Sequence, residues 1–224
     1  MTSFDIIEYD TFRVKNHILK IYFIGHGTLM FDYDGFIMHI DPVSDFADYG
    51  TMPKANCILI THQHYDHLEK KAIEAVCDDS TPIFLDEESA RMLGKGTVVR
   101  NHEQASLSDE ITLNAVPAYN ISQGREQFHP KGRDNGYIVS FGEFTVYVAG
   151  DTEPIPEMSG LGKIDVAFLP MNQPYTMTPH QAAEAAEVIK PGILYPYHFG
   201  TTDTGILVRL MESSPTEVRI RSLA

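Results

Sequence analysis

Residues 61–67 read Thr61-His62-Gln63-His64-Tyr65-Asp66-His67, so three histidines and an aspartate fall within six residues. An apolar run typical of a strand, residues 57–60, precedes this stretch, and a helical pattern begins at Leu68. Imidazole and carboxylate groups are ligands for zinc and similar divalent metals. The sequence therefore predicts a strand, then a tight loop that carries the four polar side chains, then a helix.

The loop offers two pairs of metal ligands, His62 with His64 and Asp66 with His67. One small ion cannot readily take four ligands packed so closely along one chain, whereas two adjacent ions can share them. A merely solvated polar loop is the plainer interpretation, but H-x-H-x-D-H directly after a strand is a highly specific arrangement. We therefore expect two neighbouring metal ions, each completed by ligands from elsewhere in the chain.

The loop resembles the H-x-H-x-D-H motif of the metallo-β-lactamase superfamily, and the chain looks most like its small lactonase-like hydrolases, of the L-ascorbate-6-phosphate lactonase type. This resemblance implies an α/β fold, a four-layer αββα sandwich with a metal site at one edge. Two further strand-like runs, 144–149 and 193–197, end just before Asp151 and His198. By the same resemblance, Asp151 would bridge the two metals, and His198 would complete the ion held by Asp66 and His67.

The chain departs from the lactonase-like pattern at one position. Members of that group usually carry a histidine where this sequence has Asn120. Asparagine is a poor ligand for zinc, although its carbonyl oxygen can bind harder ions such as manganese. His129 follows nine residues later in a loop that can fold back, and we favour it as the replacement ligand for the ion held by His62 and His64. The alternative is a weakened first site without a direct ligand there.

Two residues are expected to support the metal ligands without necessarily binding metal. His26 lies in a Gly-His-Gly sequence that interrupts a strand pattern, which suggests a bulge or a close approach of the backbone. A similar glycine-histidine pair lies near the site in lactonase-like members, although a histidine considered alone is more often structural. Asp41 resembles an aspartate behind the metal loop and is expected to orient a ligand.

Several polar residues are candidates for substrate binding. Asn172, Gln173 and Tyr175 follow a strand at the expected site edge, where they could bind substrate oxygens or simply form a turn. Lys131, two residues after His129, is expected to point at an anionic group of the substrate. Asn120 is a further candidate for contact with substrate.

Local signals also predict the surrounding elements. Asp34-Gly35 predicts a β-hairpin, and Asp86 is a plausible N-cap for a helix that Gly94 ends. Thr178 and Gln181 form the pattern of a capping box. Because there is no repeat, linker or low-complexity segment, we expect one domain over residues 1–224.

Composition narrows the class of protein. The formal net charge of −14 opposes non-specific binding to nucleic acid or to anionic membranes. No apolar run is long enough for a membrane helix, and Met1–Asp5 show no export signal. Cys57 and Cys77 are expected to be free thiols, which suits a reducing cytoplasm. We therefore expect a cytoplasmic protein whose partner is a small molecule, with self-association into a homo-oligomer left open.

These patterns predict a metal-dependent hydrolase. Two adjacent cations can share a water and lower its pKa enough to supply hydroxide near neutral pH, and Asp66 would orient that hydroxide besides binding metal. The expected substrate is a small ester, lactone or phosphodiester, and the expected cofactors are two divalent ions, zinc first, with manganese or iron as alternatives. The second hypothesis is a non-catalytic metal-binding or sensor protein with a degenerate site. Asn120 favours that hypothesis and the intact loop opposes it.

Overall fold

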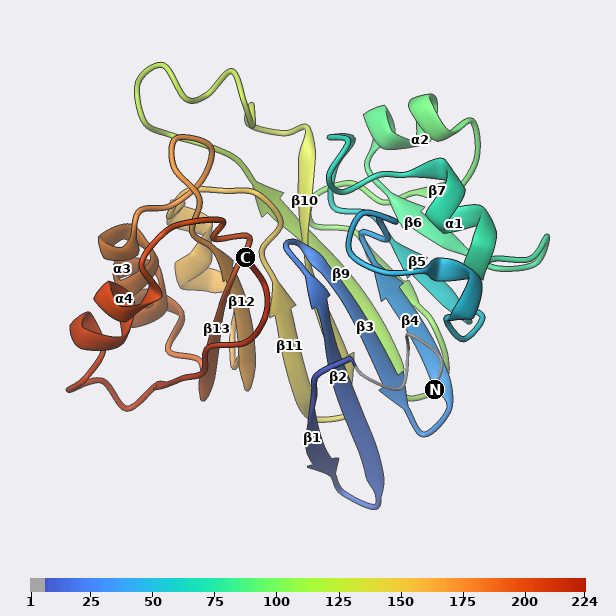
Figure 1. Ribbon diagram of the computed structural model, residues 1–224, viewed down its shortest axis with the longest axis horizontal. Coiled ribbons are helices and arrows are strands. Elements are labelled where there is room, and N and C mark those ends of the chain that lie inside the picture. Colours follow the sequence, from blue (N-terminus) through green and yellow to red (C-terminus); the bar gives the residue numbers. More distant parts are fainter. Residues whose placement is uncertain (1–6) are drawn as a thin grey trace.

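Two sheets of seven strands form the centre of the molecule (Figure 1). The structure is a computed structural model that describes residues 7–224, so Met1–Asp5, where no export signal was expected, lie outside the described residues. In the first sheet the strands lie in chain order: β1 (Tyr9–Val14), β2 (His17–Gly25), β3 (Thr28–Tyr33), β4 (Phe36–Ile40), β5 (Cys57–Leu59), β6 (Ile83–Leu85) and β7 (Thr97–Val98). In the second sheet they also lie in chain order: β8 (Gln104–Ser106), β9 (Ile111–Ala118), β10 (Asp134–Phe141), β11 (Phe144–Val148), β12 (Val166–Pro170), β13 (Ile193–Tyr197) and β14 (Glu217–Val218).

The two sheets repeat one pattern of strand directions. In each sheet the first four strands pair antiparallel and the remaining pairings are parallel. Parallel neighbours end at the same edge of a sheet, and loops at that edge are where α/β proteins place their ligands. The structure therefore contains a repeat of topology that the sequence, which shows no repeated motif, does not reveal.

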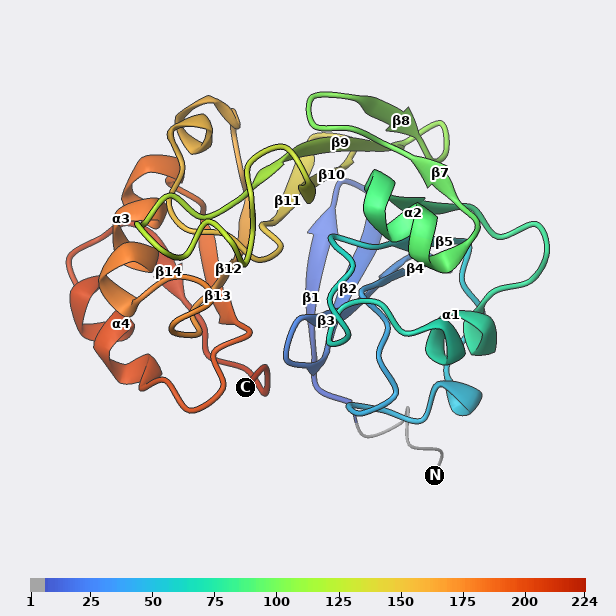
Figure 2. The same cartoon turned by 90° about the horizontal axis from the view of Figure 1, so that it is seen from above.

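Helices cover the outer faces of the two sheets, and the inner faces pack against each other. Figure 2 shows α1 (Lys70–Val76) and α2 (Glu87–Leu93) outside the first sheet, with α3 (Pro179–Ile189) and α4 (Thr204–Leu210) outside the second. Aromatic rings meet between the sheets, with ring centroids 6.3 Å apart for Phe23 and Phe168 and 6.1 Å apart for Phe31 and Phe141. This arrangement confirms the predicted αββα sandwich.

Several local predictions are confirmed. Asp34 and Gly35 take positive φ values of 48° and 91° in the turn between β3 and β4, which is the conformation that a tight hairpin requires. Asp86 caps α2 by accepting hydrogen bonds from two backbone amides, and Gly94 ends that helix in the left-handed region. Thr178 begins α3 with both hydrogen bonds of a capping box.

Two helices differ from expectation. The helix predicted from Leu68 begins only at Lys70, because residues 64–68 form a turn in which the amides of His67 and Leu68 donate to His64 O at 3.0 and 2.9 Å. Helix α4 was not predicted, since it is short and has Gly205 in its first turn, where Asp203 accepts the glycine amide. Within residues 7–224, no helix combines the length and the apolar character needed to cross a membrane.

Candidate metal centre

Asp41 holds the loop of residues 61–67 in place by hydrogen bonds. Strands β4 and β5 are parallel neighbours, so the residues that follow them lie side by side. Asp41 is fully buried, and its carboxylate accepts hydrogen bonds from Thr61 N at 2.7 Å and from Thr61 Oγ1 at 2.6 Å. The same carboxylate lies 2.8 Å from His67 Nδ1. Asp41 thus orients both the start of the loop and the ring of His67, the role expected of it.

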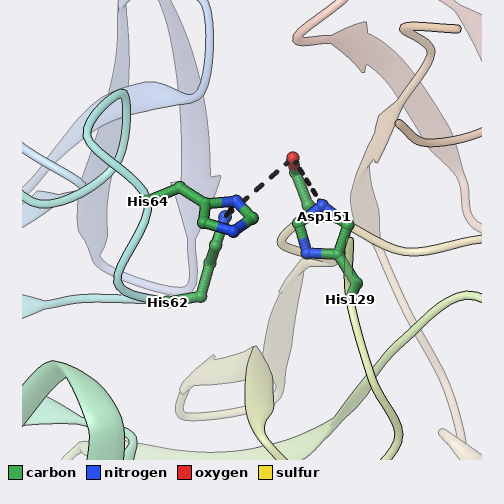
Figure 3. A group of neighbouring side chains, drawn as sticks. All are labelled: His62, His64, His129 and Asp151. Atoms are coloured by element: carbon green, nitrogen blue, oxygen red, sulfur yellow. Dashed lines mark hydrogen bonds and ion pairs between the residues drawn. The ribbon is translucent and has the colours of Figure 1, made fainter. Parts of the chain in front are cut away.

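Three imidazoles and one carboxylate converge in a first cluster, formed by His62, His64, His129 and Asp151 (Figure 3). One ligand atom from each lies within 4.8 Å of those of the others. His62 Nε2 is 3.0 Å from His64 Nδ1, and His129 Nε2 is 3.4 Å from Asp151 Oδ2. The structure therefore brings together all four residues that the sequence assigned to the first ion.

A second cluster shares Asp151 with the first. It contains His67, Asp151 and His198, again with ligand atoms within 4.8 Å of one another. His67 Nε2 lies 3.5 Å from Asp151 Oδ1, and His198 Nε2 lies 3.4 Å from Asp151 Oδ2 and 3.5 Å from Asp66 Oδ2. Asp151 therefore occupies the bridging position between the clusters.

His26 lies in direct contact with Asp66 and His198. Its Nε2 is 3.3 Å from Asp66 Oδ2, and its ring centroid is 3.7 Å from that of His198. Together His26, Asp66 and His198 form a third set whose ligand atoms lie within 4.8 Å of one another. The turn that holds His26 is tight: the residue has a φ of 52°, and the register of β2 against β3 shifts beside it.

Buried polar atoms without partners show that the clusters suit a metal. Within the described residues, His67 Nε2, Asp151 Oδ1 and His198 Nε2 are buried and make no hydrogen bond. A buried donor or acceptor left unsatisfied costs about 1–3 kcal/mol. Imidazole nitrogen and carboxylate oxygen are also the donors that zinc and similar ions accept. The residues present therefore fit the binding of divalent metal.

Burial and neighbouring charges set the protonation of these ligands. Burial, reinforced by the neighbouring histidines, holds the pKa of His62 well below its usual range, and burial also lowers the pKa of His64. Burial opposes charge on His67 too, but Asp151 and Asp41 outweigh it and raise the pKa of His67 to about 9. His62 and His64 are thus neutral and ready to bind a cation, whereas cation binding at His67 must displace a proton.

The carboxylates of Asp66 and Asp151 are ionised. Burial raises the pKa of Asp66, but the neighbouring imidazoles of His198 and His26 outweigh that effect and hold the pKa well below the usual range. Burial likewise opposes the charge on Asp151, and the surrounding histidines nevertheless lower its pKa. Both side chains can therefore act as anionic ligands near neutral pH.

The loop that carries His129 is pinned beside Asn120. The backbone amide of Asn120 donates to the backbone carbonyl of His129 at 2.8 Å, so the chain folds back as the sequence suggested. Inside the loop, the buried carboxylate of Glu153 accepts the amides of Ile121 and Ser122 at 2.8 and 2.6 Å and Nη1 of Arg125 at 3.0 Å. These bonds hold the loop so that His129 takes a position in the first cluster.

Asp134 is a functional candidate that the sequence reasoning missed. Its buried carboxylate lies 3.0 Å from His129 Nδ1, which leaves His129 Nε2 facing Asp151. Histidine ligands are commonly oriented by a carboxylate in this way. The available signal was the acidic residue five positions after His129, at the start of β10.

Two expected substrate contacts are not at the site. Lys131 donates to Tyr119 Oη at 3.1 Å and to Glu157 Oε1 at 3.0 Å, so its ammonium is held outside the cleft above the clusters. Asn120 is buried, and its side-chain amide donates to Tyr175 O at 2.7 Å instead of lining that cleft. Neither side chain lines the cleft, because each donates to partners within the protein, although Asn120 Oδ1 is buried without a partner among the described residues. That Lys131 and Asn120 contact substrate stays a prediction.

The cleft above the clusters has a volume of about 330 Å³. Asn172 and Tyr175 line it, as predicted, and so do Tyr65 and Phe128, which the sequence reasoning did not single out. Gln173 does not line it, since its side chain bonds with Arg125 and with Thr176 O. Asp66 is 23% exposed at the floor of the cleft, where a small molecule can reach it.

Two mixed sheets with outer helices, together with histidine and aspartate clusters on loops from both sheets, define a metallo-β-lactamase type of protein. The model of the beta-lactamase superfamily domain matches residues 20–198. The chain belongs to this superfamily.

Named relatives agree with this assignment. The UPF0173 metal-dependent hydrolase of Methanopyrus kandleri is 31% identical over 197 residues, covering 82% of this chain and 85% of that protein. The corresponding protein of Thermococcus kodakarensis is 32% identical, covering 82% and 86%. A crystal structure from Parabacteroides distasonis, named as a metal-dependent hydrolase, is 51% identical with a TM-score of 0.96 and covers 97% of this chain and 100% of that one. The metallo hydrolase Igni18 of Ignicoccus hospitalis shares the fold, with a TM-score of 0.75 at 22% identity over 92% of this chain and 96% of that chain.

Proposed function

We propose that this protein is a hydrolase that uses two divalent metal ions to cleave a small ester, lactone or phosphodiester. Zinc is the metal that we favour. The observation that carries the proposal is the position of Asp151, whose carboxylate lies within 3.5 Å of His67, His129 and His198. A carboxylate shared by two sets of imidazoles suits a pair of cations rather than one. The names of the relatives support the same activity.

We assign the ligand atoms to two ions. His62, His64 and His129 would hold the first, and Asp66, His67 and His198 would hold the second, with Asp151 between them. When bound, such a pair of cations would supply a Lewis acid and a water of lowered pKa. The chain's own contribution is to hold these atoms still, with Asp41 behind His67 and Asp134 behind His129.

Asp66 has the contacts expected of a group that orients the nucleophilic water. It is ionised, and its Oδ2 lies 3.3 Å from His26 Nε2. It also lines the cleft, so its carboxylate can accept a hydrogen bond from a water that enters with the substrate. The imidazole of His26 would fix the direction in which that carboxylate points.

The test is hydrolysis by the zinc-loaded or manganese-loaded protein of a panel of simple esters, lactones and phosphodiesters. Asp66→Asn keeps the size of the side chain but removes its charge, so we expect turnover to fall at least ~100-fold with folding retained. The control is Asp109→Asn, an exposed aspartate between β8 and β9 that does not line the cleft.

Two outcomes would contradict the proposal. Unchanged turnover in Asp66→Asn would place catalysis elsewhere in the molecule. A protein that holds two metal ions and cleaves nothing in the panel would instead favour the second hypothesis, a metal-binding or sensor protein. The structure gives that hypothesis less support than the sequence did, because His129 lies in the first cluster despite Asn120.

We also propose that the protein works in the cytoplasm on a small molecule. Cys57 is buried and both it and Cys77 are free thiols, which suits a reducing compartment. A cleft of about 330 Å³ is of the size that small-molecule sites usually have.

A further inference from the structure

We propose that the cleft selects neutral esters or lactones whose non-reacting part is apolar or aromatic, and discriminates against substrates that carry an additional anionic group. This inference rests on the proposed hydrolytic function and names its substrate class. It depends on the part of the cleft that lies outside the metal ligands.

Three aromatic rings from three separate loops form the rim of the cleft: Tyr65, Phe128 and Tyr175. Tyr65 is 84% exposed although it sits on the metal loop, and Tyr175 is 46% exposed. Phe128 packs edge-on against Tyr175 with ring centroids 5.1 Å apart. Large aromatic rings left exposed around a cleft are available to bury an apolar part of a ligand.

No lysine or arginine lines this cleft within residues 7–224. The loop between β9 and β10 carries three basic residues, and all three are already paired: Arg125 with the buried carboxylate of Glu153, Lys131 with Glu157, and Arg133 with Asp134. An anionic substituent would therefore lose water without gaining a partner, which is costly.

Asn172 supplies a neutral polar group to the same lining. Within the described residues its side-chain amide makes no hydrogen bond, although its backbone amide donates to Thr176 Oγ1 at 2.7 Å. The amide is thus free to donate to an uncharged oxygen of a substrate. A rim of aromatic rings with one neutral donor and no lysine or arginine matches an ester or lactone better than a phosphorylated compound.

The experiment compares two substrates with the same leaving group, p-nitrophenyl butyrate and p-nitrophenyl hemisuccinate, on the zinc-loaded protein. The acyl chains are similar in length, but only the hemisuccinate carries a carboxylate. We expect kcat/KM to be at least ~10-fold higher for the butyrate, which corresponds to one unpaired charge at the rim.

Variants of the rim make the comparison specific. Tyr65→Ala and Tyr175→Ala should each raise KM for the butyrate by ~2–10-fold, as expected for loss of one aromatic contact, and Tyr65→Phe, which keeps the ring, should raise KM less than Tyr65→Ala does. Tyr175→Lys should raise kcat/KM for the hemisuccinate by roughly 2–5-fold by supplying the missing cation. Tyr9→Ala is the matched control, since Tyr9 is 49% exposed on β1 and does not line the cleft.

Equal or faster cleavage of the hemisuccinate, or rim variants that behave like Tyr9→Ala, would overturn this inference while leaving the hydrolase proposal intact. A protein loaded with two zinc ions that cleaves neither ester, nor any other compound of the wider panel, would overturn both. Zinc content and melting temperature of each variant separate a change in substrate contact from loss of metal or of folding.

Discussion

His129 has two ring nitrogens with different tasks, and this division explains how one loop histidine can serve in place of a strand-end ligand. Its Nδ1 lies 3.0 Å from Asp134, and its Nε2 lies 3.4 Å from Asp151. A carboxylate on one nitrogen fixes the ring and leaves the other nitrogen free for a cation. Asn120, in contrast, spends its side-chain amide on Tyr175 O.

These contacts predict unequal effects on metal binding. His129→Ala should lower the affinity for the first ion by roughly 10–100-fold or more, and Asn120→Ala should lower it less. Titration of the metal-free protein with zinc against a chromogenic chelator measures both affinities. If Asn120→Ala weakens the first site more than His129→Ala does, Asn120 rather than His129 completes it.

His39 predicts a pH dependence of stability that is independent of the metal centre. The ring is buried on β4, its Nε2 lies 3.0 Å from Pro53 O, and burial lowers its pKa to about 4. The pKa of His39 is near 6.5 in the unfolded chain, so between about pH 6.5 and pH 4 His39 is protonated in the unfolded chain and neutral in the folded chain. The free energy of unfolding therefore falls as the pH drops through this window, by about 3 kcal/mol in total from this residue.

Urea unfolding at several pH values, done on the metal-free parent protein and on His39→Gln, measures the contribution of His39 to the free energy of unfolding. His39→Gln can still donate to Pro53 O but cannot take up the proton, so its unfolding free energy should fall less steeply between pH 6.5 and 4. All other titrating groups are common to the two proteins. A difference between them that does not change with pH would mean that His39 is not held neutral by burial.

At the scale of elements, the turn between β2 and β3 packs closely against the ring of His67. A Cβ atom added at Gly27 would lie 2.6 Å from Cε1 of His67. His67 cannot move away easily, because it is fully buried and bonded to Asp41. The glycine is therefore required by close approach, as the interrupted strand pattern around His26 suggested.

Gly27→Ala should accordingly displace His67 and lower the affinity for the second ion by ~10-fold or more. Gly160→Ala is the control, since an added Cβ there meets nothing within 4 Å. Zinc titration of the two variants tests the expectation. Equal affinities would show that the turn yields without disturbing the ligand.

Local signals determined which elements the sequence could predict. The turn at Asp34-Gly35 and the cap at Thr178 depend on neighbouring residues only, and both were predicted. The start of α1 depends on the turn that the metal loop makes, and α4 has little pattern of its own, so neither was placed. Asp134 was missed because its role depends on where its chain neighbour His129 points, which the distant residue Glu153 helps to fix.

At the scale of the whole molecule, the centre exists only because two similar sheets meet. The first sheet supplies the loop that contains His62 and His67, and the second supplies Asp151 and His198. The resemblance to a known superfamily supplied this long-range arrangement, which spacing along the chain could not. That residues 1–224 form one domain, and whether copies of the chain associate, stay predictions.

The most direct test of this account is a crystal of the zinc-soaked protein examined by anomalous diffraction at the zinc edge. The account predicts two zinc peaks per chain on either side of Asp151, one of them about 2.0–2.1 Å from nitrogen atoms of His62, His64 and His129. A single peak, or a first zinc ion bound by Asn120 with His129 turned away, would contradict it.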